Sequence, residues 1–146
     1  MVDEFRTCGG RLWVRKVAIK PGKPLVLGQM ADCTYVGLPG NPGALFTTFK
    51  IVVDGILRAR AGMQPDGNGE RAAVANFDWN GRPGRSTYLP AVVVGSSRGL
   101  PLIELLPDAN SGKLHQLSRG AGFIVIGPHT DRIVCGDDVR WRPFEG

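Results

Sequence analysis

The chain has few cysteines, few histidines and no long apolar run. Its three cysteines, Cys8, Cys33 and Cys135, are far apart, form no Cys-x-x-Cys pair, and are accompanied by only two histidines. This pattern favours neither a disulfide framework nor a zinc site. No apolar run approaches the ~20 residues that cross a bilayer, and the first residues lack the basic and apolar regions of a secretory signal. We therefore expect a cytoplasmic protein with reduced thiols and no membrane partner.

Common nucleotide-binding motifs are also absent. The sequence contains neither a Gly-x-Gly-x-x-Gly fingerprint nor a Walker loop. What is present is a globular composition, with 42% hydrophobic and 21% charged residues among 146, which fits one ordinary domain or two small ones. The 21 glycines and 11 prolines favour a turn-rich α/β or β protein over a helical bundle.

Positive charge is concentrated in the first part of the chain. Residues 1–62 contain nine Lys and Arg against four Asp and Glu, whereas residues 63–146 contain nine of each. A nucleic-acid partner would explain a basic segment. However, the sequence has no basic run, no aromatic stripe typical of RNA-binding domains and no helix-turn-helix pattern. The only feature that favours nucleic-acid binding is therefore the charge, and we expect no nucleic-acid partner.

Residues 1–62 read as part of an α/β domain. Residues 1–8 resemble the end of a helix that two glycines stop, and short apolar strands are expected over 12–19, 25–27 and 34–38. After residue 40 the apolar period becomes helical. Asn41 suits an N-cap and Pro42 the first helical position, and the helix is expected to end near Ala61, with Gly62 as its C-terminal glycine.

The second part of the chain reads differently. Residues 63–70 are rich in Gly, Pro, Asn and Asp, which is typical of a linker or long turn. From residue 71 to 146, short strand-like segments alternate with turn signals, which predicts a small all-β barrel or sandwich. We therefore predict two domains, at 1–62 and 71–146, joined by a linker at 63–70.

Two Pro-Gly segments share one plan: Lys-Pro-Gly-Lys at residues 20–23 and Arg-Pro-Gly-Arg at residues 82–85. Pro-Gly suits the centre of a type II turn, whose flanking residues lie within about 7 Å at Cα. Two cations held so close repel each other unless an anion lies between them. Solvated surface turns are the alternative. Alternation along a strand would also place Lys16 and Ala18 on the same face as Lys20.

A third motif precedes the predicted helix: Leu-Pro-Gly-Asn-Pro at residues 38–42. The first N–H groups of a helix have no partner within it, so they could bind a phosphate or a ring carbonyl. The alternative is a helix cap that closes a strand–helix unit. Taken alone, Ser111 is an ordinary loop serine. We interpret His115 as a packing or surface residue and His129 as a loop residue.

These motifs resemble the C-terminal part of the molybdopterin molybdenumtransferases, the family of bacterial MoeA and the gephyrin E-domain. The resemblance rests on Val-Ala-Ile-Lys-Pro-Gly-Lys-Pro at 17–24 and Gly-Leu-Pro-Gly-Asn-Pro at 37–42, followed by an amphipathic helix. It also rests, in order and spacing, on Pro83-Gly84-Arg85, the Ser111 loop and Gly-Phe-Ile-Val-Ile at 122–126. It implies the C-terminal half of a three-layer α/β molybdopterin-binding domain followed by a small β-barrel domain.

The resemblance also implies an activity. The family inserts molybdate into adenylylated molybdopterin and releases AMP, with a magnesium ion, and its members are homodimers. Catalytic roles would fall to Lys16, Lys20 and Arg85. The substrate-binding residues implied by the family motifs are Lys20, Lys23, Pro39, Asn41, Pro42, Arg85 and Ser111.

Two departures from the family pattern matter. Ala44 stands where the family usually has a serine, which removes one hydroxyl donor. The family's acidic magnesium ligands are expected upstream of this sequence, so we expect no metal ligands here and a chain that represents a C-terminal portion. The alternative is a non-catalytic remnant that binds an oxyanion, molybdopterin or another subunit. A parallel sheet lacking its other strands would expose apolar surface, so we also expect self-association.

Overall fold

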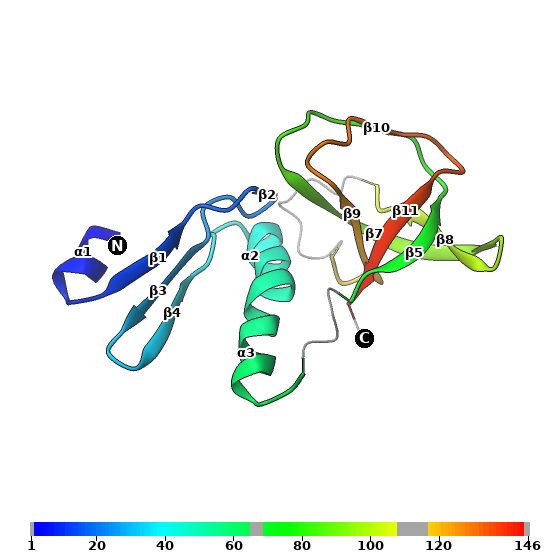
Figure 1. The fold of residues 1–146 in the computed structure, drawn as a ribbon. Coiled ribbons are helices and arrows are strands. Elements are labelled where there is room, and N and C mark those ends of the chain that lie inside the picture. Colours follow the sequence, from blue (N-terminus) through cyan, green and yellow to red (C-terminus); the bar gives the residue numbers. More distant parts are fainter. Residues whose placement is uncertain (1, 65–68, 108–116, 145–146) are drawn as a thin grey trace.

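The computed structural model describes residues 2–64, 69–107 and 117–144. Figure 1 shows a small sheet near the N-terminus, a helix beside it and a β-barrel on the other side of the helix. No helix among the described residues has the length and apolar character needed to cross a membrane.

The N-terminal part begins with the predicted helix end, α1 (Val2–Thr7). A three-stranded sheet follows, made of β1 (Arg11–Arg15), β3 (Val26–Met30) and β4 (Cys33–Gly37), in the order β1-β3-β4. Both pairings are antiparallel, so the expectation of a parallel sheet in this part is wrong for the described residues. The physical reason is that β3 and β4 are joined by a tight hairpin, with Met30 opposite Cys33, and such a connection produces only antiparallel neighbours.

The predicted helix is present, but it contains a wider turn. It consists of α2 (Pro42–Thr48), a π-helical turn η1 (Phe49–Val53) and α3 (Asp54–Arg60). Asn41 caps it and Pro42 is its first residue, as predicted. At the other end Gly62 follows with φ +73°, the left-handed conformation that favours glycine after a helix. Sequence periodicity does not reveal the π-helical turn.

The C-terminal part forms the predicted β-barrel. Its strands are β5 (Arg71–Ala75), β7 (Ser86–Ser97), β8 (Leu100–Leu105), β9 (Gly122–Ile126) and β11 (Asp138–Pro143). They pair in the order β7-β8-β5-β11-β9, and β9 pairs again with β7, which closes the ring. A two-stranded ribbon, β6 (Trp79–Asn80) with β10 (Arg132–Ile133), lies outside this ring. The main apolar core is contained in this part: Ala73, Ala75, Ala91, Ile103, Ile124, Ile126, Ile133 and Trp141.

Strand pairing and aromatic packing both join the N-terminal part to the barrel. The short strand β2 (Ile19–Lys20) pairs in parallel with the start of β7. On the other side, Phe46 of α2 packs against Phe123 and Phe144, with ring centroids 6.0 and 5.1 Å away. The domain boundary at 63–70 stays a prediction, because residues 65–68 lie outside the described part.

Candidate functional site

The β2–β7 pairing brings two of the Pro-Gly motifs to one place in the fold. Ile19 lies opposite Ser86 and Lys20 opposite Thr87, and the Ser86 N–H donates to the carbonyl of Ala18 at 3.0 Å. Paired strands are about 4.8 Å apart, and Arg85 directly precedes the paired segment. Two motifs that are more than sixty residues apart in sequence therefore meet, and Lys20 and Arg85 are both exposed there.

Lys16 does not lie on the regular strand that the sequence predicted. β1 ends at Arg15, Lys16 has φ +116°, and β2 begins only at Ile19. The predicted alternation of Lys16, Ala18 and Lys20 along one face is therefore wrong, because a residue at positive φ breaks the two-residue period. Such a conformation is uncommon for lysine and costs about 1–3 kcal/mol, and residues held in this way cluster at functional sites.

The loop at residues 20–23 is held by the backbone on both sides. Val17 N–H donates to Lys23 O, and Leu25 N–H donates to Gly22 O, both at 3.1 Å. Gly22 has the predicted positive φ, at +126°. This value is well above the about +80° of a type II turn, so the predicted turn type is wrong in detail. The hydrogen-bonded turn runs from Gly22 to Leu25, and Lys23 is exposed within it.

The bend at residues 82–85 rests on a neighbouring loop. Gly84 has φ +118°, again positive as predicted and again above the type II value. Its N–H donates to Pro128 O at 2.7 Å, and Gly81 N–H donates to Asp131 O at 2.8 Å. His129 is therefore an exposed loop residue, as predicted, but it belongs to a loop that supports the arginine bend. No local sequence signal indicates this contact.

The cations of the two motifs form no ion pair with an acidic side chain among the residues that the structure describes. In the described part of the chain, ion pairs form between Arg58 and Asp54, Arg98 and Asp138, and Arg140 and Glu70. None of these pairs involves the cations of the candidate site, Lys16, Lys20, Lys23 and Arg85. An oxyanion would supply the missing negative charge, and arginine can bind it through two parallel hydrogen bonds.

The helix N-terminus is occupied by its own cap. The Asn41 side-chain oxygen accepts hydrogen bonds from Gly43 N at 3.0 Å and Ala44 N at 3.2 Å. Leu45 N–H donates to the Asn41 carbonyl, and Pro42 has no N–H. The first-turn donors are thus already satisfied, which favours the capping interpretation over direct phosphate binding by these groups. Pro39 is buried while Asn41 and Pro42 are exposed, and their role in substrate binding stays a prediction.

Other candidate positions give less. Ala44 is buried in α2, and its side chain offers no hydroxyl at the position of the family serine. Ser111 and His115 lie outside the described residues. A Gly-x-Ser-x-Gly sequence at residues 95–99 is no nucleophile elbow, because it lies in the β7–β8 hairpin with Ser97 opposite Leu100, and the elbow joins a strand to a helix.

Among the described residues, no group of three or more His, Cys, Asp or Glu side chains is placed to hold a metal ion. The described part of the chain therefore does not fit a magnesium site. The magnesium ion implied by the family resemblance stays a prediction that concerns residues other than these.

Comparisons with known proteins agree on one family. Residues 72–144 match the family model described as the MoeA C-terminal region (domain IV). A molybdopterin molybdenumtransferase of Haemophilus influenzae is 26% identical over 130 residues, which is 88% of this chain and 32% of that protein. Molybdopterin molybdenumtransferase 2 of Mycobacterium tuberculosis is 30% identical over 125 residues, covering 86% of this chain and 30% of that protein.

The fold comparison gives the same answer. The crystal structure of the molybdopterin biosynthesis MoeA protein from Pyrococcus horikosii superposes with a TM-score of 0.77 at 25% identity. The alignment covers 99% of this chain and 34% of that one. The chain thus spans about a third of the length of the relatives it matches. It belongs to the MoeA family of molybdopterin molybdenumtransferases and corresponds to their C-terminal region.

Proposed function

We propose that this chain supplies the cationic, oxyanion-binding part of a molybdopterin molybdenumtransferase, which inserts molybdate into adenylylated molybdopterin and releases AMP. The observation that carries the proposal is the β2–β7 pairing, which brings the lysine loop beside the arginine bend. Molybdate and the pterin phosphate are both oxyanions, so lysine and arginine side chains that form no ion pair within the described part of the chain suit either of them.

In this proposal the residues of the site position molybdate and stabilise its negative charge. Lys20, Lys23 and Arg85 would neutralise molybdate and hold it near the dithiolene sulfurs of the substrate, with Ser111 as a further donor. Lys16, fixed by its unusual backbone conformation, would face the substrate. Bringing two reactants together in a fixed orientation removes much of the entropic barrier, and fixed cations stabilise charge without reorganising.

Isothermal titration of the full chain with molybdate tests the proposal. We expect Lys20→Ala and Arg85→Ala each to weaken molybdate binding roughly tenfold, since each removes a charge-assisted contact. Arg11→Ala is the matched control: it removes one exposed cation from β1, on the part of the sheet that pairs with Gln29, and should leave the affinity unchanged. A second titration with molybdopterin–AMP asks whether the same residues contact the organic substrate.

Two results would contradict the proposal. An equal loss of affinity in all three variants would mean that binding follows overall charge and not a site. Absence of binding to the wild-type chain at millimolar molybdate would mean that these residues alone do not form the site.

A second function, attachment to another subunit, has its own support. Apolar side chains are exposed on the helix and on β1, namely Leu45, Phe49, Leu57 and Trp13. Exposed apolar patches mark interaction surfaces. We therefore also propose that the chain forms a homodimer, and measuring its oligomeric state in solution tests this proposal.

A further inference from the structure

The π-helical turn of the helix leaves one carbonyl to a partner in the barrel. In an α-helix, Asp54 N–H would bond to Lys50 O. Here it donates to Phe49 O, one residue further back. The Lys50 carbonyl accepts a hydrogen bond from Arg142 Nη2 at 3.1 Å. An arginine of β11 therefore reaches the helix at the turn where its regular bonding changes, and π-helical turns are frequent at functional sites.

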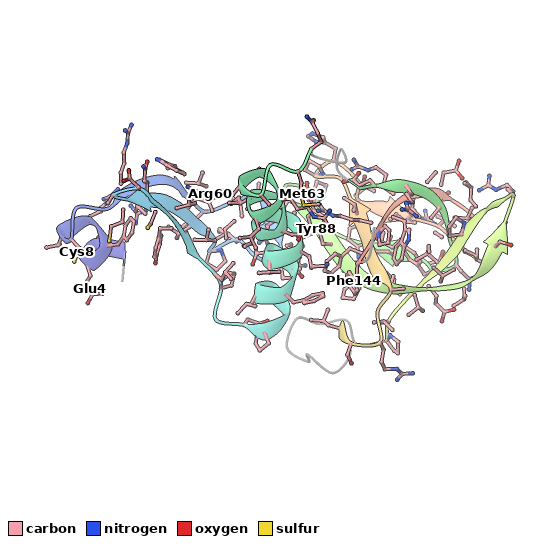
Figure 2. All side chains as sticks on the ribbon, turned by 90° about the horizontal axis from the view of Figure 1, so that it is seen from below. Glu4, Cys8, Arg60, Met63, Tyr88 and Phe144 are labelled. Carbon is pink, nitrogen blue, oxygen red and sulfur yellow. The ribbon has the colours of Figure 1, made fainter. Side chains whose placement is uncertain are left out.

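This hydrogen bond lies near the aromatic contact between helix and barrel. Arg142 is opposite Phe123 in the β11–β9 register, and Phe123 packs against both Phe46 of α2 and Phe144. Figure 2 shows Phe144 and Tyr88 between the helix and the barrel strands. The Arg142–Lys50 bond is partly buried, where a hydrogen bond is less exposed to competition from water.

The same stretch of helix supports the lysine loop. Thr48 is fully buried two residues before Lys50, and a Cβ on Gly22 would overlap Thr48 Cγ2. The loop at 20–23 therefore lies directly on the helix, next to the π-helical turn. On its other side, Lys20 is paired to β7 of the barrel. A change in the distance between helix and barrel would thus move Lys23 and Gly22 relative to Arg85.

We propose that Arg142 is a positioning residue for the oxyanion site. Its bond to Lys50 O fixes the helix on the barrel and so holds the loop at 20–23 beside the bend that carries Arg85. It is not proposed to touch the anion. This inference rests on the proposed function for the identity of the ligand. The effect of Arg142 on the position of the loop can be measured without any ligand.

The first experiment is hydrogen exchange on the full chain, comparing wild type with Arg142→Met. We expect the amides of Val17 and Leu25, which bond to the loop, to exchange roughly tenfold faster in the variant. Amides of the β3–β4 hairpin should not change. Arg140→Met is the matched control, because Arg140 lies on the same strand and pairs with Glu70 instead. Unchanged exchange at Val17 and Leu25 in a folded Arg142→Met chain would overturn the proposal, whatever the chain binds.

The second experiment measures molybdate affinity. We expect Arg142→Met to weaken binding roughly tenfold through displacement of the loop, Arg140→Met to leave it within about twofold, and Arg142→Lys to restore part of the loss by donating to Lys50 O. In the double variant with Lys20→Ala, the loss should be smaller than the product of the single losses. If the loss of affinity in the double variant equals the product of the two single losses, and exchange at the loop is unchanged, Arg142 has a merely structural role.

The two proposals can fail separately. If the wild-type chain binds no molybdate but exchange at the loop responds to Arg142→Met, the positioning contact stands and the proposed function fails for this chain alone. If Arg142→Met does not fold, Arg142→Gln, whose side chain is shorter than that of arginine, carries the same comparison. A folded Arg142→Gln chain with wild-type exchange and wild-type affinity would overturn the inference.

Discussion

At Gly22, both the backbone conformation and the surrounding packing require a glycine. Its φ of +126° lies in a region that side-chain-bearing residues rarely adopt. A Cβ there would also meet Thr48 and Ile19. The glycine of the second motif differs, because Gly84 has positive φ but no atom close to the place of a Cβ. The two motifs look alike in sequence, yet only the first is packed against the helix.

We predict that Gly22→Ala lowers the free energy of unfolding by more than about 1 kcal/mol, since it adds backbone strain and overlap. Urea denaturation measures this change. Gly55→Ala is the control: Gly55 lies within α3 and has open space around it, so alanine should be neutral or stabilise by up to about 1 kcal/mol. Equal stability of the two variants would contradict the packing described for Gly22.

Tyr88 gives the molecule a response to alkaline pH. Burial raises the pKa of its phenol, the Glu70 carboxylate raises it further, and Arg142 and Arg140 act in the opposite direction. The unfolded chain ionises this tyrosine near pH 10. The folded state therefore holds the proton more tightly, so its stabilising contribution is complete below about pH 10 and is lost as pH rises from there through the raised pKa.

We accordingly predict that Tyr88→Phe flattens the loss of stability above about pH 10. Thermal unfolding of both chains between about pH 8 and 11 measures the difference. Tyr35→Phe is the control, as Tyr35 lies in the other sheet and stacks on Phe5. An identical pH profile for wild type and Tyr88→Phe would show that another group governs the alkaline transition.

At the scale of the element, substitutions at the cap of α2 can change helix stability and anion binding independently. Asn41 holds two first-turn N–H groups. We predict that Asn41→Ala costs about 1 kcal/mol of stability, measured by urea denaturation. Asn41→Asp should retain the stability, because its carboxylate still accepts both hydrogen bonds, but should weaken molybdate binding by adding a negative charge. Full molybdate affinity in Asn41→Asp would place the helix N-terminus away from the anion.

The strands show which elements the sequence predicts well. The apolar segment at 122–126 coincides with β9, and the all-β character predicted for residues 71–146 is confirmed by the strands of the barrel. The segment at 12–19 is a strand only in its first half, within β1, because Lys16 interrupts it. Hydrophobic pattern and turn residues are local signals, whereas positive φ at a lysine is imposed by what packs around it, here the bonds from Lys16 and Val17 to the following loop.

At the scale of the whole molecule, exposed apolar side chains predict self-association. Trp13 is 53% exposed and Leu57 53% exposed. We expect size-exclusion chromatography with light scattering to show a concentration-dependent mass above that of the monomer. Leu57→Lys should shift it toward monomer. Val93→Lys is the control, because Val93 is 49% exposed on the barrel hairpin instead. A monomer at every concentration would contradict this prediction.

Some features of this protein follow from the local sequence, and others follow only from tertiary packing. The sequence by itself determined the capped helix, the Pro-Gly turns with their positive φ, the barrel strands and the family, since caps, turns and apolar periods act over a few residues. Only the tertiary structure decided the antiparallel sheet, the π-helical turn and the pairing of Ile19–Lys20 with Ser86–Thr87. That pairing joins residues far apart in the chain, and its register is set by how the helix and the barrel pack together, for which no local sequence signal exists.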